Sequence, residues 1–283
     1  MTKVEIFEVG PRDGLQNETR EIPVAEKIAL IDCLSEAGFA RIEVASFVSP
    51  KWVPQMAGSG AVLAGIKRAS GVSYAALTPN MRGFEDARAA GADEVAIFGS
   101  ASEGFSRANI NASIEESLAR FRPVADAARA ASIPVRGYVS CVVECPFDGP
   151  VPPEQVARVA RALFDMGCYE ISLGDTVGRA TPDGIDAMLR SVTSVVPANR
   201  LAGHYHDTGG RALDNIETSL GHGLRVFDAA VGGLGGCPYA PGAAGNVATE
   251  AVHDRLTAMG HETGLDPAVL SRAAEMARAM RTG

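Results

Sequence analysis

The sequence predicts an α/β fold, a (β/α)8 or TIM barrel, formed by residues 1–283 as a single domain. Its 283 residues match the usual length of such a barrel and suffice to bury a core without disulfides. Short apolar runs rich in β-branched residues alternate eight times with longer segments of helical period, as a closed parallel barrel requires. The charged turn Gly10–Gly14 follows the first run where an open doubly wound sheet would carry a glycine-rich nucleotide loop.

Each predicted strand is one of the short apolar runs. The strands cover residues 4–9, 41–46, 72–77, 94–98, 135–141, 169–173, 201–206 and 225–231. Between the first two, Pro23 suits the opening turn of a helix whose apolar positions recur on one face. These positions are Val24, Ile28, Ile31 and Leu34. Residues 4–46 are therefore predicted to form a complete β/α unit together with the strand that follows it.

Glycines mark the expected ends of four helices. Gly38, Gly91, Gly167 and Gly223 each stand shortly before a predicted strand. Glycine readily adopts the left-handed conformation that closes a helix. Because these glycines precede every second strand, they form a weak internal repeat that supports the count of eight.

The composition excludes several classes of partner. The formal net charge is −8, so no basic surface for nucleic acid is expected. The apolar run that begins at Val4 leaves no room for a targeting segment, and no apolar stretch is long enough to cross a bilayer. The five cysteines are scattered and odd in number, which indicates reduced thiols. We therefore expect a cytoplasmic protein with no nucleic-acid or membrane partner.

The polar residues at the carboxyl ends of the strands are the candidates for chemistry, because barrel enzymes place their active sites there. Residues 232–245 follow the eighth strand and are predicted to form an active-site loop, and the helical segment after about residue 244 is expected to pack on the barrel. The candidates are Arg12, Asp13, Glu43, Arg136, Tyr138, Ser140, Asp175, His204, His206, Cys237 and Asn246.

His204 and His206 are two residues apart on a predicted strand, so both imidazoles point to the same face while Tyr205 points to the other. For such a pair alone, one core and one surface histidine would be an equal alternative. Asp13 and Asn246 reach the same barrel mouth and complete a ligand set that favours Mg²⁺ or Mn²⁺. Ferrous iron in an oxygenase is a further alternative. The other histidines, His222, His253 and His261, are expected in solvent on loops or helices.

Arg12 and Cys237 have competing explanations. Arg12 beside Asp13 could be an exposed ion pair worth at most about 1 kcal/mol. At a barrel mouth it could instead stabilise an oxyanion on a thioester carbonyl, where losing one fixed donor costs roughly 3 to 4 kcal/mol. Cys237 lies on the glycine-rich loop, where it could donate a proton or act as a nucleophile. A small side chain that fills a tight loop explains Cys237 equally well.

Taken together, these residues resemble the hydroxymethylglutaryl-CoA lyase family. The similar segments keep the family's order and span nearly the whole chain: 9–17, 46–56, 78–80, 109–111, 137–141, 172–176, 204–206 and 232–246. Gly104 and residues 141–145 depart from the pattern, which leaves the exact acyl group open. A condensing synthase of the isopropylmalate or homocitrate kind shares the Arg12–Asp13 turn and the histidine pair. The chain, however, has no room for the additional domain of those synthases.

The resemblance implies cleavage of 3-hydroxy-3-methylglutaryl-CoA to acetyl-CoA and acetoacetate, as in leucine degradation and ketone-body formation, or cleavage of a longer-branched homologue. It implies Mg²⁺ or Mn²⁺ held by Asp13, His204, His206 and Asn246, in a protein that forms homo-oligomers, with a dimer favoured. Asp13 or His204 would take the hydroxyl proton, and the alternatives stay open. The other implied roles are Arg12 at the enolate oxygen, Cys237 as proton donor, Glu43 and Asp175 as orienting groups, and Arg12, Gln16, Asn109, Arg136 and Tyr138 as substrate contacts.

Overall fold

Eight parallel strands close into a barrel in the computed structural model, which describes residues 2–237 and 240–282; side chains are described for these residues except 236, 237, 240–244 and 282. The strand order around the barrel is β1-β10-β9-β8-β5-β4-β3-β2. The prediction of a TIM barrel is confirmed. The strands are β1 (Glu5–Glu8), β2 (Arg41–Ser46), β3 (Ser73–Leu77), β4 (Glu94–Ser100), β5 (Val135–Ser140), β8 (Glu170–Asp175), β9 (Leu201–Tyr205) and β10 (Val226–Ala229).

Three strand ends differ from the predicted ranges in ways that matter for the site. The seventh strand, predicted to run to residue 206, ends at Tyr205, so His206 lies directly after it. The sixth strand runs on to Asp175, which was expected after the strand. The fifth ends at Ser140, because Cys141 turns the chain with a φ of 60°.

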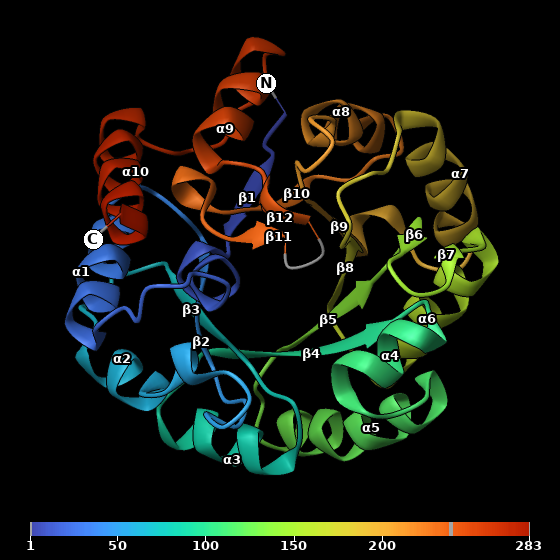
Figure 1. Cartoon of the computed structure of the whole chain (residues 1–283), viewed down its shortest axis with the longest axis horizontal. Coiled ribbons are helices and arrows are strands. Elements are labelled where there is room, and N and C mark those ends of the chain that lie inside the picture. Colours follow the sequence, from blue (N-terminus) through green and yellow to red (C-terminus); the bar gives the residue numbers. More distant parts are fainter. Residues whose placement is uncertain (1, 238–239, 283) are drawn as a thin grey trace.

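Helices form a ring around the strands (Figure 1). They are α1 (Val24–Ser35), α2 (Ser59–Gly65), α3 (Met81–Ala89), α4 (Glu103–Ile110), α5 (Ile114–Ala130), α6 (Pro153–Met166), α7 (Pro182–Thr193), α8 (Ala212–Gly221), α9 (Thr249–Ala258) and α10 (Pro267–Thr282). The last two lie beyond the eighth strand, and α10 lies beside α1 (Figure 1). The short helix η4 (Val231–Gly233) packs on α10, since a Cβ at Gly232 would lie 3.0 Å from that of Ala277.

Local sequence explains the first β/α unit. Pro23 immediately precedes α1, and Leu30, Ile31 and Leu34 of that helix are buried. Gly38 then has a φ of 96°, and a Cβ there would overlap the carbonyl oxygen of Gly264, so conformation and space both require glycine. Gly91, Gly167 and Gly223, the equivalent positions before β4, β8 and β10, also have positive φ.

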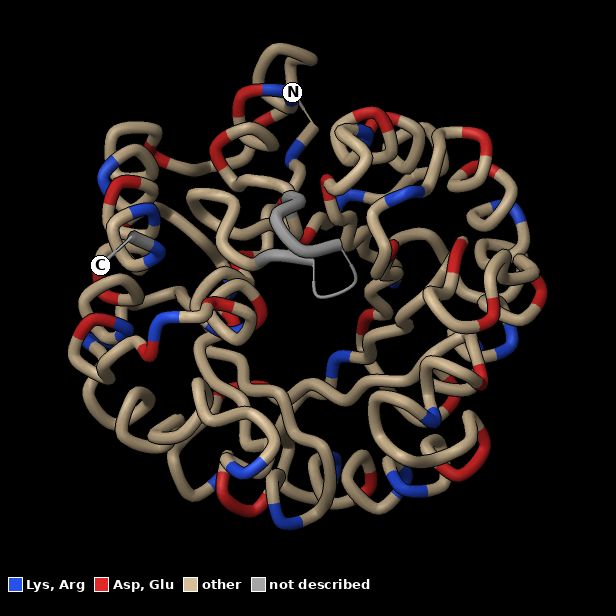
Figure 2. Tube along the Cα trace, in the orientation of Figure 1, with Lys and Arg blue, Asp and Glu red and all other residues tan. Residues whose placement is uncertain are grey.

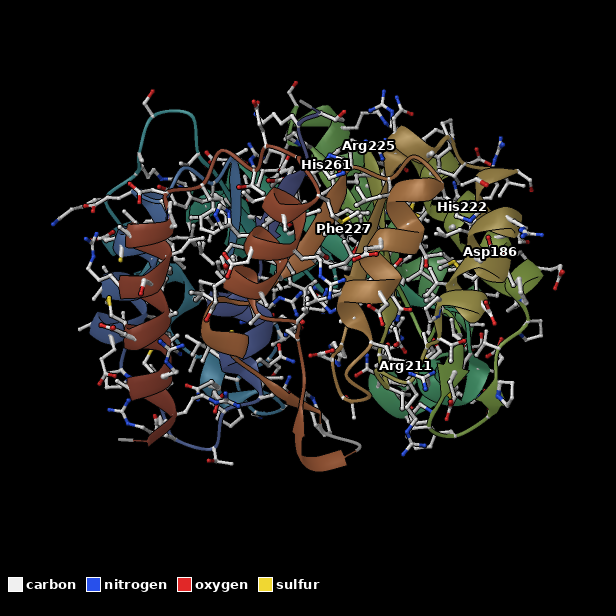
Figure 3. All side chains as sticks on the ribbon, turned by 90° about the horizontal axis from the view of Figure 1, so that it is seen from above. Asp186, Arg211, His222, Arg225, Phe227 and His261 are labelled. Carbon is white, nitrogen blue, oxygen red and sulfur yellow. The ribbon has the colours of Figure 1, made fainter. Side chains whose placement is uncertain are left out.

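Additional short elements lie at the carboxyl ends of the strands. A π-helix, η1 (Gly10–Gly14), follows β1. The hairpins β6 (Glu144–Cys145) with β7 (Gly149–Pro150), and β11 (Gly236–Cys237) with β12 (Ala240–Ala244), follow β5 and η4. Figure 3 shows the two ends of the barrel: Arg225 and His261 lie at one, and Arg211 lies at the other, together with the hairpin that contains β12.

Charged residues are intermixed around the outer helices, and more lie inside the ring (Figure 2). Within the barrel, Glu43, Arg136 and Asp228 are each at most 2% exposed. None of the described helices is long and apolar enough to cross a membrane. The barrel interior therefore contains buried charged side chains as well as apolar ones.

Candidate active site

A cavity of about 860 Å³ opens at the carboxyl ends of the strands. Its wall contains side chains from η1, from the loops after β2, β3 and β4, and from the ends of β5, β8 and β9. The sequence-predicted site residues that line it are Arg12, Asp13, Gln16, Asn109, Tyr138, Ser140, His204 and His206. Residues spread over almost 200 positions thus meet at one mouth, as the barrel topology dictates.

Asp13, His204 and His206 form a compact cluster at this mouth. One potential ligand atom from each lies within 4.8 Å of the others, and His204 Nε2 is 3.8 Å from Asp13 Oδ2. The two imidazole centroids are 5.3 Å apart. Tyr205 points the other way, and its hydroxyl lies 2.7 Å from Ser219 Oγ on α8. The alternation of side chains along β9 continues into the next residue, His206, and therefore presents two imidazoles to one carboxylate.

Asn246 reaches the cluster through backbone pairing. It forms an isolated antiparallel bridge with His206, and its side-chain Nδ2 donates to Asp13 Oδ2 at 2.9 Å. The loop that leads to it lies close to η1: Gly235 has a φ of 95°, and a Cβ there would lie 3.1 Å from the Cα of Gly14. All four residues expected to hold a metal thus lie together, and Asn246 is 4% exposed.

The protonation states of Asp13 and His206 suit a divalent cation. Burial alone would raise the pKa of Asp13, but Arg12 and the two histidines outweigh it and lower that pKa to about 2, so the carboxylate is ionised. Burial, helped by His204, lowers the pKa of His206 to about 4. His206 is therefore neutral near pH 7, and its Nδ1 is buried with no hydrogen-bond partner among the residues that the structure describes. Neutral imidazole and ionised carboxylate are the forms that bind metals.

Arg12 is held between two carboxylates. Its Nε donates to Glu43, and its Nη1 donates to Asp13 Oδ1 at 2.6 Å. Although burial opposes it, the charges of Glu43 and Asp13 raise the pKa of Arg12. Its guanidinium carbon also lies 5.6 Å from the ring centre of Tyr138. Arg12 is 5% exposed, so the alternative of an exposed ion pair in a turn is wrong.

Asp228 is the site residue that the sequence reasoning missed. It lies on β10 and accepts a hydrogen bond from Ser172 Oγ at 2.7 Å, and its Oδ2 lies 3.1 Å from His204 Nδ1. Burial would raise the pKa of Asp228, but Arg136 and His204 outweigh it and keep the carboxyl ionised. The available signal was an aspartate in an otherwise apolar strand, Val226 to Ala229. A buried carboxylate in such a run needs cationic partners inside the barrel.

The same hydrogen bond fixes which nitrogen His204 presents. Burial alone would lower the pKa of His204, but the bond to Asp228 and the charge of Asp13 together raise it. Because Nδ1 faces Asp228, Nε2 faces Asp13 and the cavity. A carboxylate behind a metal-binding histidine is a common arrangement in proteins.

Two expected roles are not matched by the positions of the residues. Asp175 accepts hydrogen bonds from the backbone N–H groups of Gly178 at 3.1 Å and Ala180 at 2.9 Å, so it shapes the loop after β8, whereas Asp228 is the carboxylate in hydrogen-bond contact with His204. Arg136 was expected to contact substrate, but it is 1% exposed and lies beneath the cavity. The reason is that Arg136 and Tyr138 lie two residues apart on β5 and both point into the barrel. Tyr138 is nearer the carboxyl end of the strand and lines the cavity, whereas Arg136 lies deeper.

Cys237 lies on β11, and its side chain is outside the described part of the chain. The expected roles of this thiol therefore stay predictions. Its loop is anchored beside η1, because the backbone N–H of Gly235 donates to Glu18 Oε1 at 3.0 Å.

The two departures from the family pattern, Gly104 and residues 141–145, are connected through Ser102 and Asp148. The backbone N–H of Gly104 donates to Asp148 Oδ2 at 2.7 Å, and a Cβ at Gly104 would overlap Asp148. Ser102 Oγ donates to the same oxygen and lies 2.8 Å from Cys145 Sγ. The hairpin β6-β7 thus holds the start of α4, the helix whose Phe105 and Asn109 line the cavity.

Two of the remaining histidines are not simply solvated, as they were expected to be. His222 Nε2 lies 2.9 Å from Asp186 Oδ1, a contact between α8 and α7 whose residues are close together in Figure 3. His253 Nδ1 lies 2.8 Å from Thr263 Oγ1. Both histidines therefore connect outer elements of the barrel.

The closed parallel barrel and the polar cluster at its mouth define a β/α-barrel enzyme. The family model described as HMGL-like matches residues 3–277. A Pseudomonas aeruginosa protein named 3-hydroxy-3-isohexenylglutaryl-CoA/hydroxy-methylglutaryl-CoA lyase is 60% identical over 264 residues, which are 93% of this chain and 88% of that protein. The hydroxymethylglutaryl-CoA lyase of Pseudomonas mevalonii is 56% identical over 266 residues, 94% of this chain and 88% of that protein. The chain belongs to the HMGL-like family, which includes the hydroxymethylglutaryl-CoA lyases, and it is a lyase.

Solved structures agree with this assignment. The HMG-CoA lyase of Brucella melitensis is 62% identical and superposes with a TM-score of 0.99 over 100% of both chains. An HMG-CoA lyase of Acinetobacter baumannii, solved in complex with coenzyme A and 3-methylmalate, is 35% identical. Its TM-score is 0.93, over 99% of this chain and 92% of that one.

Proposed function

We propose that this chain cleaves 3-hydroxy-3-methylglutaryl-CoA to acetyl-CoA and acetoacetate in a retro-Claisen reaction that depends on Mg²⁺ or Mn²⁺. The observation that carries the proposal is the cluster of Asp13, His204 and His206 beside the held guanidinium of Arg12. The names of the lyase relatives, and the coenzyme A bound by the A. baumannii relative, support the choice of substrate.

Asp13, His204, His206 and the amide of Asn246 would hold the cation. This set of two imidazole nitrogens and two oxygens suits Mg²⁺ or Mn²⁺, and it contains no thiolate of the kind that structural zinc prefers. When bound, the cation supplies Lewis acidity that orients the substrate's oxygen atoms and favours loss of the hydroxyl proton.

The residues around the cluster account for the movement of protons and electrons. Asp13 or His204 takes the proton of the tertiary hydroxyl; the bond between C2 and C3 then breaks, and C3 becomes the ketone carbon of acetoacetate. The electron pair passes to the thioester fragment, where Arg12 stabilises the enolate oxygen. Cys237 delivers a proton to C2 and completes acetyl-CoA. The anchoring of its loop beside η1 supports that role.

Other residues would hold the substrate and its catalytic partners. Gln16, Asn109 and Tyr138 line the cavity and are proposed to contact the acyl-CoA. Gln16 Oε1 is buried and has no hydrogen-bond partner among the described residues, so it is available to a ligand. Glu43 orients Arg12 rather than a metal ligand.

The experiment that tests the proposal identifies both products. Protein stripped by a chelator and reloaded with Mn²⁺ is incubated with 3-hydroxy-3-methylglutaryl-CoA, and the products are measured by mass spectrometry. We expect equimolar acetyl-CoA and acetoacetate, and neither without metal. Intact substrate would refute the proposal. Oxygen consumption would indicate an iron oxygenase, and condensation of acetyl-CoA with a 2-oxo acid would indicate a synthase.

A 3-hydroxyglutaryl-CoA with a longer alkyl branch at C3 is a second candidate substrate. Leu77, Ala96 and Tyr138, with Phe98 packed against them, form an apolar wall on β3, β4 and β5. In the strand order β3 lies opposite β9, which carries His204 and is directly followed by His206. The P. aeruginosa relative is named for a substrate with an isohexenyl branch. Comparing kcat/KM for methyl and longer-branched substrates tests this candidate, and Leu77→Phe should selectively impair the longer one.

The physiological setting is part of the same proposal. The products acetyl-CoA and acetoacetate fit leucine degradation and ketone-body formation, in a single-domain cytoplasmic enzyme that assembles as a homodimer. Light scattering of the purified protein measures the subunit number, and fractionation of the source cell locates it.

A further inference from the structure

Arg136 occupies the centre of an ionic chain inside the barrel. Its Nε donates to Glu170 Oε1 at 2.7 Å. Its Nη2 and Nη1 donate to the two oxygens of Asp228 at 2.7 and 3.0 Å, and Nη1 also donates to the hydroxyl of Tyr138 at 2.9 Å. The chain continues from Asp228 to His204 Nδ1, 3.1 Å away. A buried arginine on β5 is thus two contacts from the proposed metal ligand on β9.

We infer that Asp228 and Arg136 are positioning residues for His204: Arg136 holds the Asp228 carboxylate in place, and Asp228 holds the imidazole so that Nε2 faces the cation. The inference rests on the cation site of the proposed function. Neither residue touches the substrate in this arrangement, since both are at most 2% exposed and neither lines the cavity.

The geometry of the Arg136–Asp228 pair supports a positioning role. Two parallel N–H groups contact two carboxylate oxygens, an arrangement that fixes the plane of both groups. Ser172 Oγ donates to Oδ2, the same oxygen that faces His204, at 2.7 Å. With each oxygen engaged, the carboxylate cannot rotate without losing several buried hydrogen bonds. His204 therefore meets an acceptor in a set position.

Tyr138 provides a second contact between Arg136 and His204. The hydroxyl accepts a hydrogen bond from Arg136, and the ring lies edge-on to His204 with centroids 6.2 Å apart. A merely structural ion pair between β5 and β8 would need only Glu170. The additional bonds of Arg136 all lead toward the residues that surround the cation site.

Arg41 offers a matched control at the other end of the ionic chain. It contacts Glu170 at 3.0 Å and Glu5 at 2.6 Å, so it is also a largely buried arginine on a barrel strand. Its described contacts do not include Asp228 or His204. Arg41→Lys should therefore disturb the barrel interior without changing how His204 is held.

The test measures binding of Mn²⁺ alone to metal-free protein by titration calorimetry, without substrate. Asp228→Asn keeps the side-chain shape but leaves one oxygen to serve both Arg136 and His204. We expect this variant to bind Mn²⁺ roughly 10–100-fold more weakly than the wild type, the usual effect of losing a group that orients a metal ligand. Arg136→Lys should weaken binding in the same direction, because an ammonium cannot reproduce the two parallel contacts. Arg41→Lys should bind Mn²⁺ as the wild type does.

Unchanged Mn²⁺ affinity in folded Asp228→Asn would overturn the inference; if that variant does not fold, unchanged affinity in Arg136→Lys would overturn it instead. An equal loss in Arg41→Lys would also overturn it, because the effect would then be general disturbance of the barrel. A wild type that binds no Mn²⁺ would do the same. Lyase activity of the wild type is assayed separately. If the acyl-CoA is not cleaved while the Mn²⁺ pattern holds, only the proposed substrate fails.

Discussion

Asn246 donates a hydrogen bond to Asp13 at 2.9 Å although 233 positions separate the two residues. The contact joins the turn after the first strand to the segment after the eighth. It exists because barrel closure pairs β1 with β10 and because Asn246 bridges to His206. Closure of the barrel therefore assembles the site from residues that are far apart in the sequence.

Replacing His206 by alanine should chiefly weaken cation binding. His206 is one of the proposed cation ligands, and loss of its imidazole should weaken binding by at least the roughly 10–100-fold typical of groups that only orient ligands. Calorimetric titration with Mn²⁺ measures the change. His222→Ala, which removes an imidazole paired with Asp186 on the outer helices, is the matched control and should bind normally. An unaltered titration of His206→Ala would exclude it as a ligand.

Arg12→Lys should nearly abolish turnover while the fold persists. A lysine places a point charge on a flexible stem and cannot contact Glu43 and Asp13 in one plane. We expect kcat to fall by about 100- to 1000-fold, the range for one lost oxyanion donor. Arg20→Lys, in an ion pair with Glu26 away from the cavity, controls for the change of side chain. Near-normal turnover of Arg12→Lys would remove Arg12 from the mechanism.

Cys237→Ser should keep its metal and slow the reaction. A hydroxyl is a much weaker acid than a thiol, so protonation of the departing fragment should become slower, by about 100- to 10,000-fold for loss of a general acid. Steady-state kinetics and Mn²⁺ titration together measure this separation. Cys33→Ser, at a buried thiol on α1, is the control. If Cys237→Ser turns over at the wild-type rate, the thiol only fills space in its loop.

Glu8→Gln should remove a dependence of stability on pH. Glu8 is buried beneath the site, where it accepts from the N–H groups of Gly10 and Val231 and from the hydroxyl of Thr249. Burial, only partly offset by these bonds, raises the pKa of Glu8 to about 7. The folded protein thus holds this proton more tightly than the unfolded chain, whose pKa is 4.5. Stability is accordingly lost as the pH rises from 4.5 to about 7 and then levels off.

The size of that effect follows from the two pKa values. Their difference corresponds to at most about 3 kcal/mol in the free energy of unfolding. Chemical denaturation of the wild type and of Glu8→Gln at pH 5 and pH 8 measures it, and the wild type should lose stability relative to the variant at the higher pH. Glu115→Gln, on an exposed position of α5, is the control. Parallel pH dependence in the wild type and Glu8→Gln would show that Glu8 keeps an ordinary pKa.

Much of the fold could be predicted from the sequence because its signals are local. The alternation of apolar runs with helical periods predicted all eight barrel strands, and the four glycines before alternate strands adopt the expected positive φ. The spacing of His204 and His206 required only the two-residue repeat of a strand. Family membership was likewise recognisable, because several motifs occur in the same order along the chain.

Contacts between distant strands were decided by the tertiary structure. From the sequence, Arg136 was expected to contact the substrate and Asp175 to orient the metal ligands. How deeply each side chain is buried in the barrel, however, depends on how the sheet closes and on where each strand ends. The role of Asp228 could not be predicted locally, because its partners Arg136 and Ser172 lie 92 and 56 positions away in the sequence. The sequence by itself determined the barrel and the residue types at its mouth. Only closure of the sheet decided which buried charges pair, since charge pairing depends on distance in space.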